Sequence, residues 1–522
     1  MMGSMPTEIL SRIFEHLETP ISLQYWEPVD GDTFPPSRDL VALSRVSHLF
    51  QTIARPLMYR TVALRSKKGV TDSSMDKFMN VLCADPSIGH NIQVLQVAPW
   101  LSKFGFENFA QKLCASPDKL DERQKRWLSM WMEAGDDDEF RGEVLAALVA
   151  APRLQTLDYM EIGSLKGIAA YLSGRQDAED DYFATALDGD SDSDMDDVDY
   201  FTTALDSDTD SDSNAPDEIG SKIASKDGDE DGESGDVPAG HQESQLLGPP
   251  SENPMSRLRE VRVGFRCDGS ILERVQKVEG VLLNPGLEIL RLSAFRWTKY
   301  EVEAMKWKND TSNITTLQLK NCLIDERGLA NALRRCRRLR HLDIALAGDN
   351  NNHLDTLNLN EMGVALRRFG QSLESLDFDS TESGDYTMVG HIGPLSELSR
   401  LKSLKICPND FGKFEENEVN EEELKREFKT SLPPTLQFIR IRPSRRKRTM
   451  PILLTLLTDE VFGGLQTVEV GGVVMFQDDT KALEVPGWSK SFRTDKVCSN
   501  GTHPVEFDNF FSVNFSRDVE VR

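Results

Sequence analysis

The sequence lacks the features that mark secreted and membrane proteins. Its 522 residues contain only seven cysteines, which are scattered, so neither a disulfide framework nor a zinc site is indicated. No apolar run approaches the roughly 18 residues that a membrane-spanning helix needs. The N-terminal residues also lack the basic segment followed by an apolar one that would indicate a secretion signal. These absences predict a protein of the cytoplasm, the nucleus or both, with no membrane partner.

Catalytic motifs are also missing. The sequence has no HExxH zinc motif, no glycine-rich phosphate loop ending in Lys-Ser/Thr and no Gly-x-Ser-x-Gly turn. The eight histidines are isolated from one another. We therefore expect no catalytic residue, no metal and no cofactor, and a chain that is not an enzyme by itself.

Positive charge is scarce in one segment and negative charge is concentrated there. Residues 177–236 contain 23 Asp or Glu residues and only two Lys, so they account for 21 of the chain's 26 net negative charges. Low hydrophobicity with so much like charge cannot offset the entropy of ordering. We expect a long disordered acidic insertion over residues 176–254, and a nearly neutral remainder.

A dense basic stretch lies at residues 440–448, with six Arg or Lys. Such a stretch is typical of a nuclear localisation signal or a nucleic-acid patch. We prefer the interpretation of a solvated loop between a repeat strand and its helix. Because six basic residues cannot outweigh the acidic segment at a distance, we expect no nucleic-acid partner.

An apolar hexapeptide recurs along the chain. Apolar residues occupy its first, fourth and sixth positions, as in LEILRL from Leu287 and LRHLDI from Leu339. Copies begin at Ile92, Leu154, Leu258, Leu287, Ile314, Leu339, Leu373, Leu401, Leu436 and Leu465. From Leu258 onward the copies lie 25–35 residues apart, close to the period of about 20–29 residues that leucine-rich repeats have.

Each repeated unit reads as a short strand followed by a helix, most clearly a helix from Asp325 and another from Met450. One such unit cannot cover its own apolar face, but stacked units share a continuous core. The pattern favours an α/β leucine-rich-repeat solenoid. A conventional α/β sheet, which also alternates strands and helices, is the alternative.

The N-terminal residues predict a small helical module. In MPTEILSRIFEHL, which begins at Met5, the spacing of Ile9, Ile13 and Leu17 gives one apolar stripe on a short helix. Helical spacing resumes near Leu40 after a loop rich in Pro, Gly and Asp. The periodicity alone also fits an ordinary helical bundle.

These residues resemble the F-box motif, in the form found in many fungal F-box proteins. The match runs from Pro6-x-Glu8-Ile9-Leu10 through Ile13-Phe14 and Leu17 to Asp39-Leu40, Leu43, Val46-Ser47 and Phe50. The resemblance implies three helices that bind a Skp-type adaptor and, through it, a cullin-RING ubiquitin ligase. The residues implied to bind the adaptor are Pro6, Ile9, Leu10, Ile13, Phe14, Leu17, Leu40, Leu43, Val46 and Phe50.

By this resemblance the chain is an F-box protein with leucine-rich repeats, and the repeats recruit a protein substrate for ubiquitin-dependent degradation. The expected segments are an F-box at 1–62, first repeats and connecting helices at 63–175, the acidic insertion at 176–254, the solenoid at 255–475 and a C-terminal cap or tail at 476–522.

The expected substrate site lies on the concave face of the repeats. Side chains along a strand alternate between the core and the opposite face, which places charges of one sign on consecutive units. Because neighbouring like charges repel, we interpret such groups as sites for an opposite charge. The residues are Arg262, Arg291 and Lys320, then Asp343, Asp377 and Asp379, and then Lys405 and Arg440. Mixed charges that merely keep an exposed sheet in solution are the alternative.

Two other functions remain open at this point. The chain is alternatively an interaction scaffold with no role in ubiquitin transfer. It is alternatively an acidic nuclear chaperone, whose Asp-rich and Ser-rich segment binds basic proteins.

Overall fold

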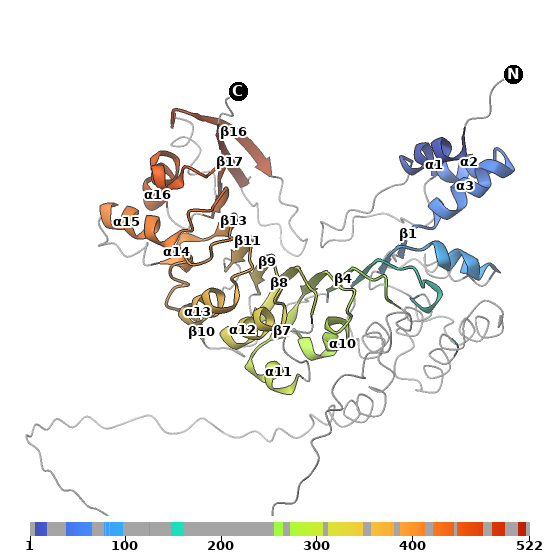
Figure 1. Cartoon of the computed structure of the whole chain (residues 1–522), viewed down its shortest axis with the longest axis horizontal. Coiled ribbons are helices and arrows are strands. Elements are labelled where there is room, and N and C mark those ends of the chain that lie inside the picture. The colour runs from blue at the N-terminus through green and yellow to red at the C-terminus, as the bar shows by residue number, and fades with distance from the viewer. Residues whose placement is uncertain are drawn as a thin grey trace, which may run out of the picture. The chain divides into compact units, whose positions relative to one another are not determined.

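A computed structural model describes residues 6–17, 38–64, 78, 80–82, 84–97, 125, 148–160, 255–264, 272–305, 312–347, 356–380, 387–412, 421–442, 446–472, 483–495 and 510–517. The described chain is mixed α/β and contains one large, mostly parallel sheet (Figure 1). The expected acidic insertion at 176–254 and the loop at 18–37 lie outside the described residues. In the described part, no helix is both long enough and apolar enough to cross a bilayer.

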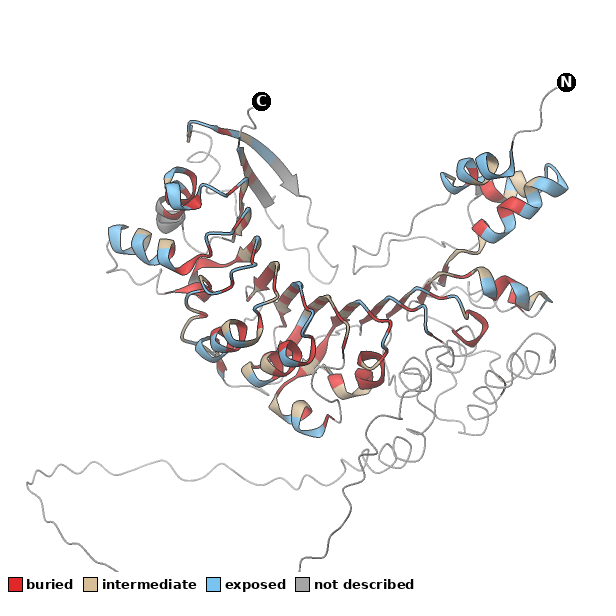
Figure 2. Cartoon of the chain, viewed as in Figure 1, coloured by how far each residue is buried: buried red, intermediate tan, exposed pale blue. Residues whose placement is uncertain are grey.

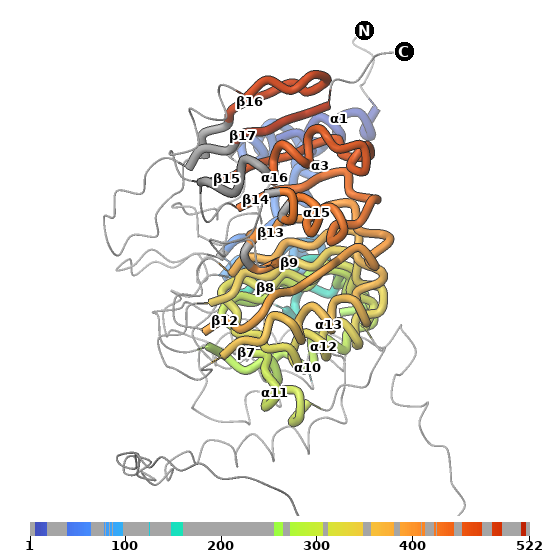
Figure 3. The backbone as a smooth tube through the Cα atoms, turned by 90° about the vertical axis from the view of Figure 1, so that its left-hand side faces the viewer, coloured from blue at the N-terminus to red at the C-terminus, as the bar shows by residue number. Residues whose placement is uncertain are grey.

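The strands of the main sheet follow one another in space in the order of the sequence. Each of the following strands pairs in parallel with the next. They are β1 (Thr61–Leu64), β2 (Val94–Val97), β3 (Thr156–Met160), β4 (Glu260–Gly264), β6 (Ile289–Ser293), β8 (Thr316–Ile324), β9 (His341–Leu346), β11 (Ser375–Asp379), β13 (Ser403–Ile406), β14 (Phe438–Ile441) and β15 (Thr467–Gly472). Figure 3 shows the succession from β8 to β15.

Every one of the ten hexapeptides supplies a strand, from β2 to β15. Equivalent positions are paired: the fourth residues Leu157, Val261, Leu290 and Leu317 lie opposite one another on β3, β4, β6 and β8. The register therefore follows the apolar pattern, because a shift by one residue would turn every apolar side chain to the other face.

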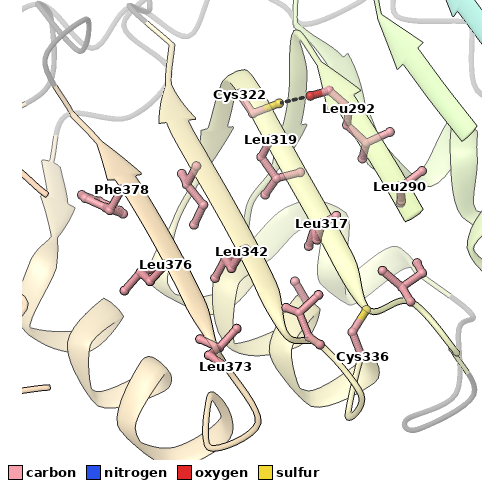
Figure 4. Packing of buried hydrophobic residues seen from close by; sticks show 14 of the residues in the cluster. Leu290, Leu292, Leu317, Leu319, Cys322, Cys336, Leu342, Leu373, Leu376 and Phe378 are labelled. Atoms are coloured by element: carbon pink, nitrogen blue, oxygen red, sulfur yellow. Dashed lines mark hydrogen bonds between the residues drawn. The ribbon is translucent and has the colours of Figure 1, made fainter. Parts of the chain in front are cut away.

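The fourth and sixth positions form a core on one face of the sheet. Leu317, Leu319, Leu342 and Leu376 are each at most 1% exposed, and Figure 4 shows them on neighbouring strands, directed to the same side. Helices cover this face (Figures 1 and 2). They include α10 (Glu279–Leu282), α11 (Lys299–Ala304), α12 (Glu326–Arg335), α13 (Leu359–Phe369), α14 (Pro408–Phe411), α15 (Glu421–Ser431) and α16 (Arg446–Thr458).

The helices begin at side chains that bind their free backbone N–H groups. Asp325 accepts a hydrogen bond from Gly328 N at 2.7 Å at the start of α12, and Asn358 does the same for the first turn of α13. Such caps are each worth about 1 kcal/mol. The helices predicted from Asp325 and Met450 correspond to α12 and α16.

Short elements complete the repeated units. β5 (Glu273–Arg274), β7 (Phe295–Trp297) and the end of β8 form a second parallel ladder, and β10 (Thr356–Asn358) pairs with β12 (Thr387–Val389). Among the described residues, the 3₁₀ turns are η1 (Pro86–Asn91), η5 (Val275–Val278) and η6 (Glu460–Phe462).

The C-terminal residues extend the sheet by an antiparallel hairpin. β17 (Phe510–Arg517) pairs with β15, and β16 (Trp488–Asp495) pairs with β17. Trp488 is 9% exposed, and its Nε1 donates to Leu457 O of α16 at 3.0 Å. Part of the segment expected to be a cap or tail, residues 476–522, therefore continues the sheet.

The N-terminal helices have a core of their own. α1 (Thr7–Glu15), α2 (Arg38–Ser44) and α3 (His48–Met58) bury Phe14, Leu40, Ile53, Ala54 and Leu57. The rings of Phe14 and Phe50 meet edge to face, with 5.2 Å between their centroids. Apolar residues whose spacing predicted these helices therefore lie in this small core.

Candidate functional site

The helices α1–α3 leave large apolar side chains in contact with solvent. Ile9 and Ile13, one turn apart on α1, are 49% and 45% exposed, and Val46 and Leu49, which flank the start of α3, are 66% and 46% exposed. We call these four residues the exposed apolar set. Single exposed apolar residues are ordinary, but several of them on so small a module are typical of an interaction surface.

The ten residues implied to bind an adaptor differ in how far their side chains are exposed. Pro6, Ile9, Ile13 and Val46 are exposed, whereas Leu10, Leu17, Leu43 and Phe50 are half-buried. Phe14 and Leu40 are only 3% and 1% exposed and lie inside the module. A charge at Leu40 would therefore disrupt the module's own core. Leu49, which the motif did not single out, is exposed beside the matching residue Phe50.

The module is joined to the sheet without an intervening segment. α3 ends at Met58, β1 begins at Thr61, and Arg60 O between them accepts hydrogen bonds from Gln93 N and Val94 N of the next unit, at 2.9 and 3.0 Å. Arg60 also lies 3.5 Å from Glu15 of α1. These contacts tie α1 and α3 to the first strands.

A second connection joins α3 to η1. Arg55 forms an ion pair with Asp85, which also accepts a hydrogen bond from Ser87 N at 3.1 Å. The hydrogen bond from the Ser87 side chain and the charge of Arg55 lower the pKa of Asp85, although burial opposes them. The carboxylate therefore stays ionised at neutral pH and keeps both contacts.

On the face opposite the helices, the fifth residues of the hexapeptides form one continuous row. We call it the position-five row. Its members pair across adjacent strands in register. They are Gln96, Asp158, Arg262, Arg291, Gln318, Asp343, Asp377, Lys405, Arg440 and Glu469.

Two of the predicted substrate residues lie outside this row. Lys320 lies opposite Ser293, and Gln318 rather than Lys320 lies opposite Arg291. Asp379 lies opposite Ala345, two residues beyond Asp377. Lys320 therefore does not continue the line that Arg262 and Arg291 begin, because it occupies the seventh position of its unit.

The basic residues of the predicted site have acidic partners within the chain. Arg262 and Asp158 are both 1% exposed and lie 3.5 Å apart, and burial lowers the pKa of Arg262. Arg291 Nε lies 2.7 Å from Glu260. Because its guanidinium is buried and paired, Arg262 is not available to an outside anion, whereas Arg291 is paired but keeps 23% of its side chain exposed.

The acidic residues are paired in the same way. Lys320 Nζ lies 2.6 Å from Asp343, and Asp377 accepts from Lys405 at 2.8 Å. Arg442 lies 2.9 Å from Asp377 and 3.3 Å from Asp379. Arg440 lies 3.6 Å from Glu469. The position-five row and its flanking charges thus form a largely self-compensated network.

The buried carboxyl groups of this network differ in their pKa. Burial raises the pKa of Asp343 despite its contact with Lys320. For Asp377 burial acts in the same direction, but the charges of Arg442 and Lys405 outweigh it and lower the pKa. Asp377 is therefore the better stabilised anion of the two.

The described residues include carboxyl, imidazole and thiol groups, which are common metal ligands. Among them, no group of three or more His, Cys, Asp or Glu is arranged to hold a metal ion. Cys322, Cys336 and Cys407 are buried free thiols. Burial raises the pKa of Cys336 to about 12, so this thiol stays protonated at neutral pH and is a poor nucleophile.

No protein-family model matches the chain, and no curated protein matches it either.

Proposed function

We propose that the chain is a non-catalytic, substrate-recruiting subunit of an SCF-type ubiquitin ligase. In this proposal α1–α3 form an F-box that binds a Skp-type adaptor and, through it, a cullin-RING core. The sheet and its helices form a leucine-rich-repeat solenoid that binds a protein substrate.

The observation that carries the proposal is the exposure of apolar side chains at F-box positions. Ile9, Ile13 and Val46 match the motif and remain about half exposed or more. Full burial of such a side chain is worth about 1.5–3 kcal/mol, so covering half of each would supply roughly 1 kcal/mol. A partner that covers the exposed apolar set, which also includes Leu49, therefore gains part of its binding free energy from these side chains.

The geometry of the repeated units supports the solenoid part. Strands that pair strictly in sequence order, with equivalent residues opposite one another, are what stacked units require. Cys322 occupies the ninth position of its unit, where leucine-rich repeats carry Asn or Cys. Its Sγ lies 3.6 Å from Leu292 O of the preceding strand (Figure 4).

In this proposal the substrate contacts the face opposite the helices. Lys405 and Arg440 keep 34% and 30% of their side chains exposed on adjacent strands. Lys405 and Arg440 are paired within the chain, as the other predicted residues are, so the position-five row would shape this surface rather than supply free charge to it.

The adaptor contact is tested by comparing Ile13→Asp with Val364→Asp. The two positions are matched, because Ile13 is 45% and Val364 on α13 is 44% exposed. We expect Ile13→Asp to reduce co-purification of a Skp-type adaptor at least about tenfold, since a charge buried in an interface core costs more than 1.4 kcal/mol. Val364→Asp should leave it unchanged, and circular dichroism should show both variants folded.

Ubiquitin transfer separates a ligase subunit from a scaffold. In a reconstituted ligase, proteins captured by the wild type should be ubiquitinated, and Ile13→Asp should abolish this while capture persists. Equal adaptor binding by the two Asp variants would refute the F-box assignment. Adaptor binding without any ubiquitin transfer would favour the scaffold.

A further inference from the structure

A set of exposed basic residues lies at the edge of the sheet where the strands begin. It starts in RRCRRLR, residues 334–340, which holds five arginines in seven positions. Figure 4 shows the turns of Cys336 and Leu373 side by side at this edge. We call the set the basic rim, and its members, all exposed, are Arg334, Arg338, Arg340, Arg368, Arg400 and Lys402.

Two members of the basic rim share one aromatic ring. Arg334, in the last turn of α12, lies over Phe369 with 4.9 Å to the ring centroid, and Arg368 of α13 lies 5.1 Å from the same centroid. Neither of them, nor Arg338, forms an ion pair with any residue that the structure describes. The ring holds the two guanidinium groups near each other without neutralising them.

Three other members surround a single carboxylate. Glu374 lies 3.7 Å from Arg340, 3.4 Å from Arg400 and 3.5 Å from Lys402. These cations come from neighbouring strand starts, because Glu374 N donates to Arg340 O and Lys402 N donates to Glu374 O. The arrangement demonstrates that a carboxylate fits among these cations, and it leaves them in excess.

The side chains of this cluster remain accessible. Arg340, Arg400 and Lys402 are 58%, 57% and 53% exposed. Desolvation is the largest single effect on Glu374 and opposes its ionisation, but the charges of Lys402 and Arg340 together outweigh it and lower the pKa. Long, exposed ion pairs of this kind are weak, so an incoming anion can replace them at little cost.

The ends of the helices explain only part of this charge. Basic residues in the last turn favour the negative end of a helix, and α12 and α13 both end here. Each end carries about half a negative charge. Glu374 and Glu397 are the carboxylates in the same turns. The two helix ends supply about one negative charge and the two carboxylates supply two more, so the six cations keep a surplus of roughly three positive charges.

The kind of partner follows from what the basic rim contains and lacks. Sites for single-stranded nucleic acid combine positive charge with exposed aromatic rings on which bases stack. The ring at this site, Phe369, is half-buried and lies under two guanidinium groups. Arginine forks bind carboxylates well, and Glu374 already occupies such a position.

We propose that the basic rim binds an acidic segment of another protein, one with several Asp or Glu residues close together. The surface is distinct from the position-five row and from α1–α3. The proposal does not depend on the ligase function, because it concerns direct binding with no adaptor present.

The test is a fluorescence-anisotropy titration of the full chain. The probe is a labelled peptide of about 12 residues with Glu at alternate positions, and its counterpart carries Gln instead. At low salt we expect the Glu peptide to bind at least about tenfold more tightly, and the difference to shrink as salt screens the charges. The titration is repeated with residues 177–236 deleted, since the net charge of −26 repels an acidic ligand at long range.

Charge reversals on and off the basic rim give the decisive comparison. The double variant Arg338→Glu/Lys402→Glu should weaken binding of the Glu peptide at least about tenfold. Arg327→Glu/Arg426→Glu makes the same change in net charge at exposed positions on α12 and α15 away from the rim, and should bind almost as the wild type does.

Several outcomes would overturn the proposal. They are equal affinity for the Glu and Gln peptides in both forms of the chain, equal effects of the two double variants, and tighter rim-dependent binding of single-stranded DNA of similar charge. Inorganic phosphate as a competitor distinguishes a site for any anion from one for a carboxylate-rich segment. Phosphate that displaces the Glu peptide at equal concentration would refute the choice of ligand.

Discussion

Asp377 has two cations as partners and a second carboxyl group beside it. Lys405 of β13 and Arg442, which directly follows β14, donate to it, while Asp343 lies opposite on β9. The charges of the two cations lower its pKa below the usual 3.8, although burial raises it. The ionised form of Asp377 is therefore stabilised by folding.

The first prediction concerns Asp377→Asn. A lowered pKa in the folded state gives stability that is complete above the ordinary value of 3.8 and is lost as the pH falls through the lower folded-state value. We expect the variant to lose about 1–3 kcal/mol of unfolding free energy at pH 7, and less at about pH 3. Urea unfolding followed by circular dichroism measures both.

Asp343→Asn is the matched control for this prediction. Burial raises the pKa of Asp343, so its ionisation opposes folding at neutral pH and the sign is reversed. Its loss of stability at pH 7 should be smaller than that of Asp377→Asn. A loss for Asp377→Asn that is the same at both pH values would contradict the electrostatic explanation.

At this scale the sequence indicates the face on which a side chain lies but not its exposure. The period of two correctly placed Arg262 and Asp377 on the face opposite the helices. It could not show that Arg262 is 1% exposed and paired with Asp158, which is 104 positions away. The basic rim was missed for a related reason, since its cations come from different units and only part of it forms a run.

The packing of helices on the sheet depends on close backbone contacts at two glycines. A Cβ atom added to Gly328 of α12 would lie 1.7 Å from Trp297 O, and one added to Gly363 of α13 would lie 1.8 Å from Ile392 O. Both neighbours are backbone atoms, which cannot turn aside as a side chain can. Each helix therefore rests directly on the chain of an adjacent unit.

The second prediction is that Gly328→Ala and Gly363→Ala destabilise the protein. In a free helix Ala is favoured over Gly by about 1 kcal/mol, but here the clash forces the helix away from the core. We expect a net loss of about 2 kcal/mol or more for each variant, measured by urea unfolding. Gly464→Ala is the control, since its Cβ would lie 3.5 Å from the nearest atom, and no loss is expected there. A gain in stability at Gly328 or Gly363 would contradict the contact.

The sequence indicated strands better than it indicated these contacts. Strands repeat their apolar pattern, whereas Gly328 and Gly363 differ in their position within α12 and α13. The hairpin of β16 and β17 escaped prediction because it does not carry the hexapeptide. Its signal was the alternation in FFSVNFSR, where Val513 and Phe515 are buried and Asn514 and Ser516 less so.

Across the whole molecule, strand order equals sequence order from β1 to β15. β3 and β4 obey this rule although 99 residues separate Met160 from Glu260. Arg259 N and Glu260 N both donate to Gln155 O, at 2.8 and 3.0 Å. The contact between these strands therefore has the same geometry as that between strands joined by short connections.

The third prediction is that residues 176–254 can be replaced by a short flexible linker. The β3–β4 contact is made by residues that remain, and a shorter connection costs less entropy to close. We expect the melting temperature to change by less than about 4 °C, which corresponds to roughly 1 kcal/mol. Removing residues 326–336, which contain α12, should abolish cooperative unfolding. A large drop on replacing 176–254 would contradict the prediction.

The sequential order of the strands also bears on how such a chain changes over generations. Along the main path of the sheet, each strand pairs with the strand before it and the strand after it. A gene can therefore lengthen the stretch between two strands, or gain or lose a whole unit, without altering the path of the other strands. The 94 residues between Met160 and Met255 show how long such a stretch can be while β3 and β4 still pair. New recognition sequences can thus be acquired at the junctions while the inherited framework stays the same.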